Sequence, residues 1–148
     1  MPARNPRIKT AQEQRIAKLE SHLAMARWAI LHLMSDDAQR ILTRLTDAKD
    51  RIELWSASER AAEAIVDLCP NPVQPLWRGE PLGAPRAPCP LCGGGTASPR
   101  EEGYALPTGL MRHLLGSHNS SQCDVFEAAF ELALDFIESD GWQSRAGR

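Results

Sequence analysis

The segment from Thr10 to Cys69 contains neither proline nor glycine, so none of the residues that usually break helices interrupts it. Within it, apolar side chains recur at alternating intervals of three and four residues, which is the spacing of a heptad repeat. The first set, which we call the first heptad seam, is Ile16, Leu19, Leu23, Ala26, Ile30 and Leu33. This spacing predicts a helix over residues 10–34.

A second heptad seam follows after a step of five positions, and it consists of Ala38, Ile41, Leu45, Ala48, Ile52 and Trp55. Between the seams, Ser35 precedes Asp36 and Asp37, a combination typical of an N-cap followed by acidic residues at the positive end of a helix. We therefore expect a second helix over residues 36–55 that folds back on the first as an antiparallel hairpin. One long interrupted helix that pairs with a second copy of the chain is the alternative geometry.

A third helix is expected over residues 56–69, because Ser56 and Glu59 have the spacing of a capping box. The following segment, residues 70–88, contains six prolines. Proline lacks a backbone donor and disfavours helical backbone in the residue before it, so this segment is predicted to be an extended linker.

The C-terminal part of the chain carries two adjacent apolar stripes at helical spacing. They are Phe126, Phe130, Ala133 and Ile137, and beside them Val125, Ala129, Leu132 and Phe136. These stripes predict a helix over residues 122–139, capped by Ser120 or Ser121 and stopping at Gly141. Its wide apolar face is expected to pack against the N-terminal helices.

The stretch Cys89-Pro90-Leu91-Cys92-Gly93 indicates a metal-binding turn. Two thiolates at this spacing can bind one tetrahedral zinc ion, and the glycine permits the tight bend that the turn needs. Two histidines follow, His113 and His118. We expect Thr108 to cap a short helix that presents His113 to the metal.

These residues resemble a two-Cys-two-His zinc finger. The resemblance covers residues 89–118 only, and Leu110, three residues before His113, also fits it. One departure is that twenty residues separate Cys92 from His113, where the family has about 12. The resemblance implies one structural Zn²⁺ bound by Cys89, Cys92, His113 and His118. Whether Cys123 replaces one of the histidines stays open, and Cys69 is expected to be a buried thiol.

Four protein ligands leave no coordination position for the water that a hydrolytic zinc requires. The sequence contains no phosphate-binding loop, nucleophile elbow or dinucleotide fingerprint. We therefore expect a protein that is not an enzyme.

Nucleic-acid binding is the alternative function. Aligned with a DNA-reading finger, the helix offers only Arg112 as a side chain that can contact base edges. A basic N-terminal tail adds Arg4, Arg7 and Lys9. These four residues are the candidates for a DNA-binding transcriptional regulator. A single finger with one such residue is a poor sequence-specific binder, so this function ranks second.

Charge and hydropathy exclude some other classes. Seventeen basic and nineteen acidic residues give a net charge of −2, which does not fit a surface built throughout for nucleic acid or membranes. The chain has no apolar run long enough to span a membrane, and residues 11–18 supply no apolar core of a signal peptide. We expect a soluble, cytoplasmic protein.

The predicted fold is all-α with a small zinc-finger hairpin. Its expected parts are a basic tail (1–9), a coiled-coil-like helical region (10–69), the proline-rich linker (70–88), the zinc finger (89–118), a C-terminal helix (119–140) and a tail (141–148). The predicted function is that of a non-enzymatic adaptor or regulator, which binds a protein partner or itself through its helices.

Overall fold

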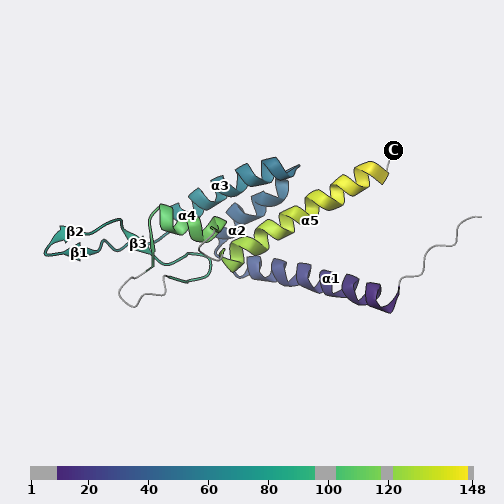
Figure 1. The fold of residues 1–148 in the computed structure, drawn as a ribbon, viewed down its shortest axis with the longest axis horizontal. Coiled ribbons are helices and arrows are strands. Elements are labelled where there is room, and N and C mark those ends of the chain that lie inside the picture. The colour runs from purple at the N-terminus through teal and green to yellow at the C-terminus, as the bar shows by residue number, and fades with distance from the viewer. Residues whose placement is uncertain (1–9, 96–102, 118–121, 147–148) are drawn as a thin grey trace, which may run out of the picture.

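The computed structural model describes residues 10–95, 103–117 and 122–146, with side chains described as far as Ser139. Helices dominate this part of the chain (Figure 1). They are α1 (Ala11–His32), α2 (Asp36–Thr43), α3 (Arg51–Asp67), α4 (Thr108–Leu115) and α5 (Asp124–Ala146), with a 3-10 turn, η1 (Arg44–Asp47), directly after α2. The broad prediction of a mainly helical fold is confirmed.

Helix α1 begins close to its predicted start, where the Thr10 hydroxyl accepts a hydrogen bond from the backbone N–H of Glu13 at 3.1 Å. Its main packing partner is α5 and not α2. The Trp28 ring meets the Phe136 ring edge-on, with centroids 6.3 Å apart, and the Arg27 guanidinium lies 3.5 Å from the Asp135 carboxylate. Figure 1 shows the two helices meeting near the C-terminal end of α1 and diverging toward its N-terminal end. The expected hairpin of the first two helices is therefore not the principal contact of α1.

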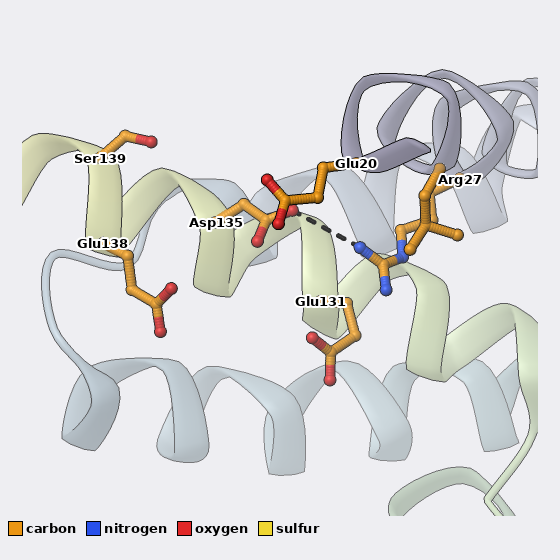
Figure 2. Close-up of a pocket in the computed structure, with 7 residues that line it drawn as sticks. Glu20, Arg27, Glu131, Asp135, Glu138 and Ser139 are labelled. Atoms are coloured by element: carbon orange, nitrogen blue, oxygen red, sulfur yellow. Dashed lines mark ion pairs between the residues drawn. The ribbon is translucent and has the colours of Figure 1, made fainter. Parts of the chain in front are cut away.

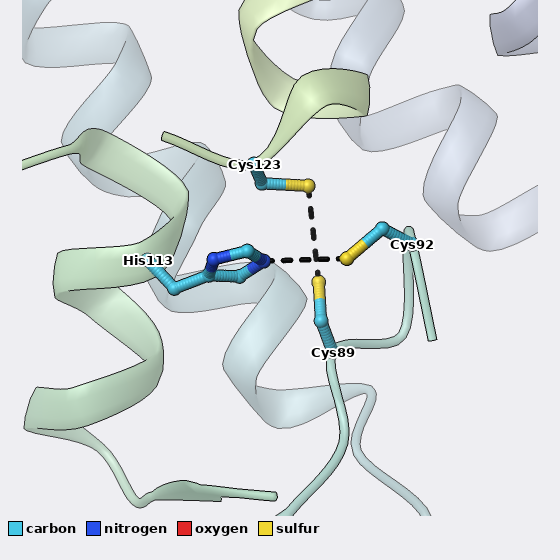
Figure 3. Close-up of side chains that lie close together, drawn as sticks. All are labelled: Cys89, Cys92, His113 and Cys123. Carbon is cyan, nitrogen blue, oxygen red and sulfur yellow. Dashed lines mark hydrogen bonds between the residues drawn. The ribbon is translucent and has the colours of Figure 1, made fainter. Parts of the chain in front are cut away.

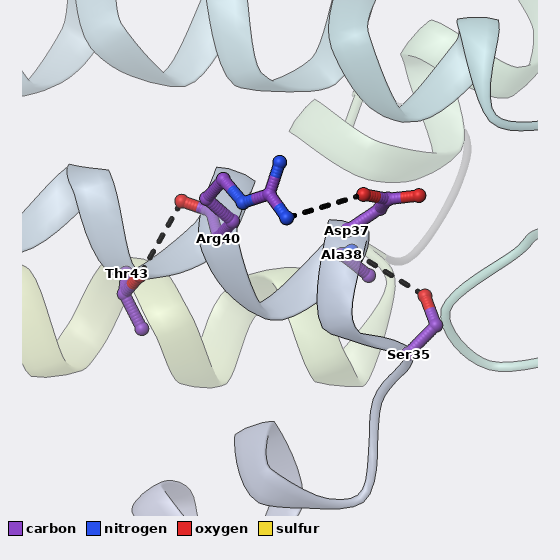
Figure 4. A network of polar contacts seen from close by, with 5 residues as sticks. All are labelled: Ser35, Asp37, Ala38, Arg40 and Thr43. Atoms are coloured by element: carbon purple, nitrogen blue, oxygen red, sulfur yellow. Dashed lines mark hydrogen bonds and ion pairs between the residues drawn. The ribbon is translucent and has the colours of Figure 1, made fainter.

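Helix α2 confirms the predicted cap at Ser35, whose hydroxyl accepts a hydrogen bond from the Ala38 N–H at 3.3 Å (Figure 4). The predicted length of this helix is wrong. It ends at Thr43, whose hydroxyl donates back to the Gln39 carbonyl at 2.8 Å, and the chain tightens into η1 before Ala48 becomes extended. The second heptad seam thus spans two helices separated by a bend.

Helix α3 starts earlier than the capping-box spacing predicts. Asp50 is its N-cap, and the Asp50 carboxylate accepts a hydrogen bond from the Glu53 N–H at 2.7 Å. Ser56 lies inside the helix, so the predicted start at Ser56 is wrong. The bend before Asp50 lets Leu45 and Leu54 both reach the core. Burial of these two side chains is therefore favoured over the continuous helix that the seam predicts.

The proline-rich segment is extended, as predicted, and it folds into a hairpin. Strands β1 (Leu76–Trp77) and β2 (Glu80–Pro81) pair around Arg78 and Gly79, both of which have positive φ angles. A second antiparallel pair joins β3 (Arg86–Ala87) to β4 (Tyr104–Ala105). This second pair carries the chain from the linker into the predicted metal-binding region.

Helix α5 confirms the expectation that its apolar face packs against the N-terminal helices, since it contacts α1, α3 and η1. The predicted caps, Ser120 and Ser121, lie outside the described residues. The predicted stop at Gly141 is wrong, because the helix continues to Ala146. Glycine ends a helix where the backbone turns to positive φ, and Gly141 keeps a helical backbone.

One core cluster joins the N-terminal helices to the predicted finger region. Its fully buried members include Leu31, Leu42, Leu45, Leu54, Ile65, Leu110, Leu114, Phe126, Cys89 and Cys123. Two cysteines therefore lie within the same core as the leucines of α2, α3 and α4.

Candidate metal centre

The Cys89–Cys92 turn has the backbone of a metal-binding knuckle. The Gly93 N–H donates to the Cys89 carbonyl at 2.8 Å, and the Cys89 N–H donates to the Gly94 carbonyl at 2.9 Å. Gly93 has a φ of 70°, a conformation that residues with a Cβ rarely adopt. This geometry brings both sulfurs to the same side of the turn, as Figure 3 shows.

Helix α4 supplies the imidazole. His113 Nε2 lies 3.3 Å from Cys92 Sγ, and the Tyr104 ring of β4 stacks on the His113 ring with centroids 4.3 Å apart. Thr108 is the first residue of α4 and not its cap. The N-cap is Pro107, which has no side-chain donor or acceptor, so the predicted role of Thr108 is wrong.

Cys123 approaches the other three side chains from the N-terminal end of α5. Its sulfur lies 3.9 Å from Cys89 Sγ. Two hydrogen bonds hold this residue beside α4: the Cys123 N–H donates to the His113 carbonyl at 2.7 Å, and the Gln122 side-chain amide donates to the Leu114 carbonyl at 2.9 Å. The end of α4 and the start of α5 therefore place His113 and Cys123 together.

Together these four side chains form a cluster that could hold one metal ion. The ligand atoms of Cys89, Cys92, His113 and Cys123 all lie within 4.8 Å of one another, and Figure 3 shows them converging on a common point. Around a tetrahedral zinc with bonds of about 2.3 Å, sulfur atoms are about 3.8 Å apart. The separation of 3.9 Å between Cys89 Sγ and Cys123 Sγ fits this arrangement.

The electrostatics of the cluster favour negative charge on one sulfur, that of Cys89. The pKa of Cys89 is lowered to about 5, chiefly because the Cys123 thiol donates a hydrogen bond to the Cys89 thiolate. The same hydrogen bond, with burial, raises the pKa of Cys123. Burial raises the pKa of Cys92, although the Gly94 N–H donates to the Cys92 sulfur at 3.3 Å. A thiol and a thiolate that share a proton are suited to binding a cation, which replaces that proton.

Three of the four predicted ligands, Cys89, Cys92 and His113, are brought together by the structure, and the fourth, His118, lies outside the described residues. Among the described residues, the fourth member of the cluster is Cys123. One sequence signal favours it: Cys123 lies in the first turn of the helix predicted over residues 122–139, and helix N-termini stabilise thiolates.

The other sequence candidates lie elsewhere. Cys69 is a half-buried thiol whose sulfur lies 3.9 Å from the Pro88 carbonyl, and burial raises its pKa. Arg112 is exposed on α4. Arg4, Arg7 and Lys9 lie outside the described residues. The structure thus separates Cys69 from the four clustered side chains and leaves Arg112 open to solvent.

Comparison of the chain with protein-family models, with curated proteins and with solved structures found no match. Within the described residues, no helix combines the length and the apolar composition that a membrane crossing requires.

Proposed function

We propose that this protein is a non-enzymatic, zinc-binding adaptor or regulator that acts through protein–protein contacts of its helical surfaces. Zinc is the expected metal, because three thiolates and one imidazole in a tetrahedral arrangement are a common structural zinc site. Four protein ligands complete the tetrahedral coordination and leave no position for a catalytic water. The metal would therefore supply stability and not chemistry.

The position of the cluster supports this structural role. Its ligands come from the knuckle after β3, from α4 and from the N-terminal end of α5, which are separate segments of the chain. One ion would tie these three segments together next to the buried Leu110 and Leu114. Because short segments with small cores need such a tie, metal binding here would contribute directly to folding.

The observation that carries the interaction function is the exposure of the first heptad seam. Ile16, Leu19 and Leu23 are 47%, 57% and 49% exposed, and Leu33 is 81% exposed. Ile16, Leu19 and Leu23 form an exposed apolar stripe on two successive turns of α1, and such a patch on a protein surface often marks a binding site. Among the large side chains of the seam, only Ile30 packs against the chain's own core. The exposure of the others favours a second helix as the ligand of this stripe.

A location inside the cell fits the thiol chemistry. All four cysteines are described by the structure and all are free. Thiolate ligands stay reduced in the cytosol, whereas an oxidising compartment promotes disulfides.

The test is a pull-down from lysate with the tagged, zinc-loaded full chain, in the presence and absence of nuclease. The variant Leu19→Glu with Leu23→Glu places two charges on the seam. The matched control, Met25→Glu, changes an apolar residue of α1 that is 66% exposed and lies off the seam. We expect nuclease-resistant protein partners that the wild type and the control retain and the seam variant loses.

Partners retained equally by the seam variant would contradict the proposal. Partners that disappear with nuclease would instead support the DNA-binding alternative, in which Arg112 and the basic N-terminal residues Arg4, Arg7 and Lys9 carry the contacts.

A further inference from the structure

Helix α1 uses one face for its own chain and leaves another open. Trp28 and Arg27 face α5, and Leu31 is almost completely buried. The first heptad seam lies on the neighbouring face, where Leu19 and Leu23 are about half exposed. Apart from the packing of Ile30 against the core, the intramolecular contacts of α1 therefore do not explain its heptad spacing.

An acidic cleft runs beside the seam between α1 and α5 (Figure 2). Its volume is about 810 Å³, and its lining is Glu20, Leu23, Arg27, Glu131, Asp135, Glu138 and Ser139. Asp135 pairs with Arg27, and the Glu138 carboxylate lies 3.0 Å from the Arg51 guanidinium. Among the described residues, no ion pair is formed by Glu20 or Glu131. A helix lying on the seam would therefore meet an excess of negative charge along one edge.

We propose that the occupant of this surface is a second copy of the chain, whose α1 packs against the first in parallel and in register. This inference rests on the proposed function and names the partner of the seam. With Ile16 at heptad position a and Leu19 at position d, Arg15 takes position g and Glu20 takes position e.

Charge complementarity favours this partner and this orientation. In a parallel, in-register pair, a g residue faces the e residue five positions further along the other helix. Arg15 of each copy then faces Glu20 of the other, which gives two ion pairs related by the twofold axis. The same arrangement brings the Arg15 edge of the second helix toward the acidic cleft. A second copy thus provides both the apolar seam and the positive charge that this surface lacks.

The seam is short, so the context of α1 matters. It spans residues 16–33, and most of the stability of a helix in a protein comes from tertiary packing and not from intrinsic propensity. Packing of Trp28 and Leu31 onto the chain's own core holds the C-terminal half of α1 in helical form before any partner binds. Part of α1 is therefore already ordered as a helix in a single chain. Burial of the seam between two chains can then stabilise the dimer.

The experiment is sedimentation equilibrium of the full, zinc-loaded chain over a wide concentration range. The mass of one chain is 16.3 kDa, and we expect the wild type and Met25→Glu to approach twice that mass. Leu19→Glu with Leu23→Glu is expected to stay at the mass of one chain, while circular dichroism and zinc content remain as in the wild type. A wild type that stays monomeric at every concentration, or a seam variant that still dimerises, would overturn the inference.

A charge exchange tests the orientation. Arg15→Glu and Glu20→Arg are each expected to weaken the dimer about tenfold, because each creates two like-charge contacts. The variant carrying both changes restores opposite charges and should bind within about twofold of the wild type. Absence of this rescue would overturn the parallel arrangement.

The two proposals fail in different ways. A monomeric wild type that still captures a nuclease-resistant protein through the seam overturns the second-copy inference alone. A monomeric wild type whose captured proteins are indifferent to the seam variant overturns both.

Discussion

Cys89 Sγ and Cys123 Sγ lie 3.9 Å apart although 34 positions separate the two residues in the chain. The contact joins the knuckle after β3 to the residue that precedes α5 and completes a cluster with Cys92 and His113. The proposed zinc site is therefore a tertiary feature, which only the packed arrangement of α4 and α5 can form.

Replacement of the ligands tests the membership of this site. Cys123→Ala and His113→Ala are each expected to lower zinc affinity by more than about 100-fold, because even the outer partners of metal ligands are worth 10–100-fold. Affinity is measured by competition with a chromophoric chelator. Cys69→Ser is the control and should bind like the wild type, since its thiol lies outside the cluster.

His118→Ala distinguishes the two possible ligand sets. If Cys123 is the fourth ligand, this variant keeps its zinc affinity. A large loss in His118→Ala, together with normal binding by Cys123→Ala, would show that the two-Cys-two-His set is the correct one.

The ring of Tyr104 is expected to orient His113. Tyr104→Ala removes the stacking contact at 4.3 Å and should lower zinc affinity about tenfold. Tyr104→Phe keeps the ring and should bind within a factor of about two of the wild type. Equal affinity of Tyr104→Ala and Tyr104→Phe would show that the stack has no positioning role.

Gly103 is expected to be intolerant of any side chain. It has a φ of 92°, and a Cβ at this position would lie 2.2 Å from the backbone carbon of Ala87 in β3. Gly103→Ala should lower the free energy of unfolding by more than about 2 kcal/mol, since left-handed backbone and a steric clash add together.

The matched control is Gly79→Ala. Gly79 has a φ of 81° but nothing within 4 Å of its added Cβ. Only the strain of a left-handed backbone applies there, so we expect the free energy of unfolding, measured by urea denaturation, to fall by about 1 kcal/mol. Similar losses in both variants would mean that the β3 contact at Gly103 relaxes freely.

The start of α3 can be tested by its cap. Asp50→Ala removes the acceptor of the Glu53 N–H and should lower the free energy of unfolding by about 1 kcal/mol. Ser56→Ala changes an exposed residue within the helix and should alter it by less than about 0.5 kcal/mol. The opposite ranking in urea denaturation would place the start of the helix at Ser56.

The sequence was informative where the deciding interactions are local. The cap at Ser35 was identifiable because a cap and the backbone N–H that donates to it lie three residues apart. The knuckle at Cys89 and Cys92 was identifiable for the same reason. His113 followed from the resemblance to a zinc finger, whose helix carries the histidine at this position.

Where long-range packing decides, the sequence was ambiguous. The second heptad seam continues through Ala48 to Ile52 and Trp55, yet the chain bends before Asp50. The bend buries Leu45 and Leu54 and leaves Ile52 and Trp55 exposed. A heptad pattern does not reveal which of its residues finds a partner, and the same ambiguity hid the exposure of the first heptad seam.

Cys123 illustrates a further limit. No motif spacing links Cys123 to Cys89 in the sequence. The interval from His113 to His118, in contrast, resembles that of a zinc finger and made His118 the expected ligand. Hydrogen bonds from Cys123 and Gln122 to the carbonyls of His113 and Leu114 set the position of Cys123. These contacts depend on how α5 meets α4.

The decisive measurement for the metal site is X-ray absorption spectroscopy of the zinc-loaded full chain, once its metal content has been measured. A site of three cysteines and one histidine predicts one zinc ion per chain, with three sulfur neighbours at about 2.3 Å and one nitrogen neighbour at about 2.0 Å. Absence of stoichiometric zinc, a shell of two sulfurs and two nitrogens, or an oxygen neighbour from a bound water would contradict it.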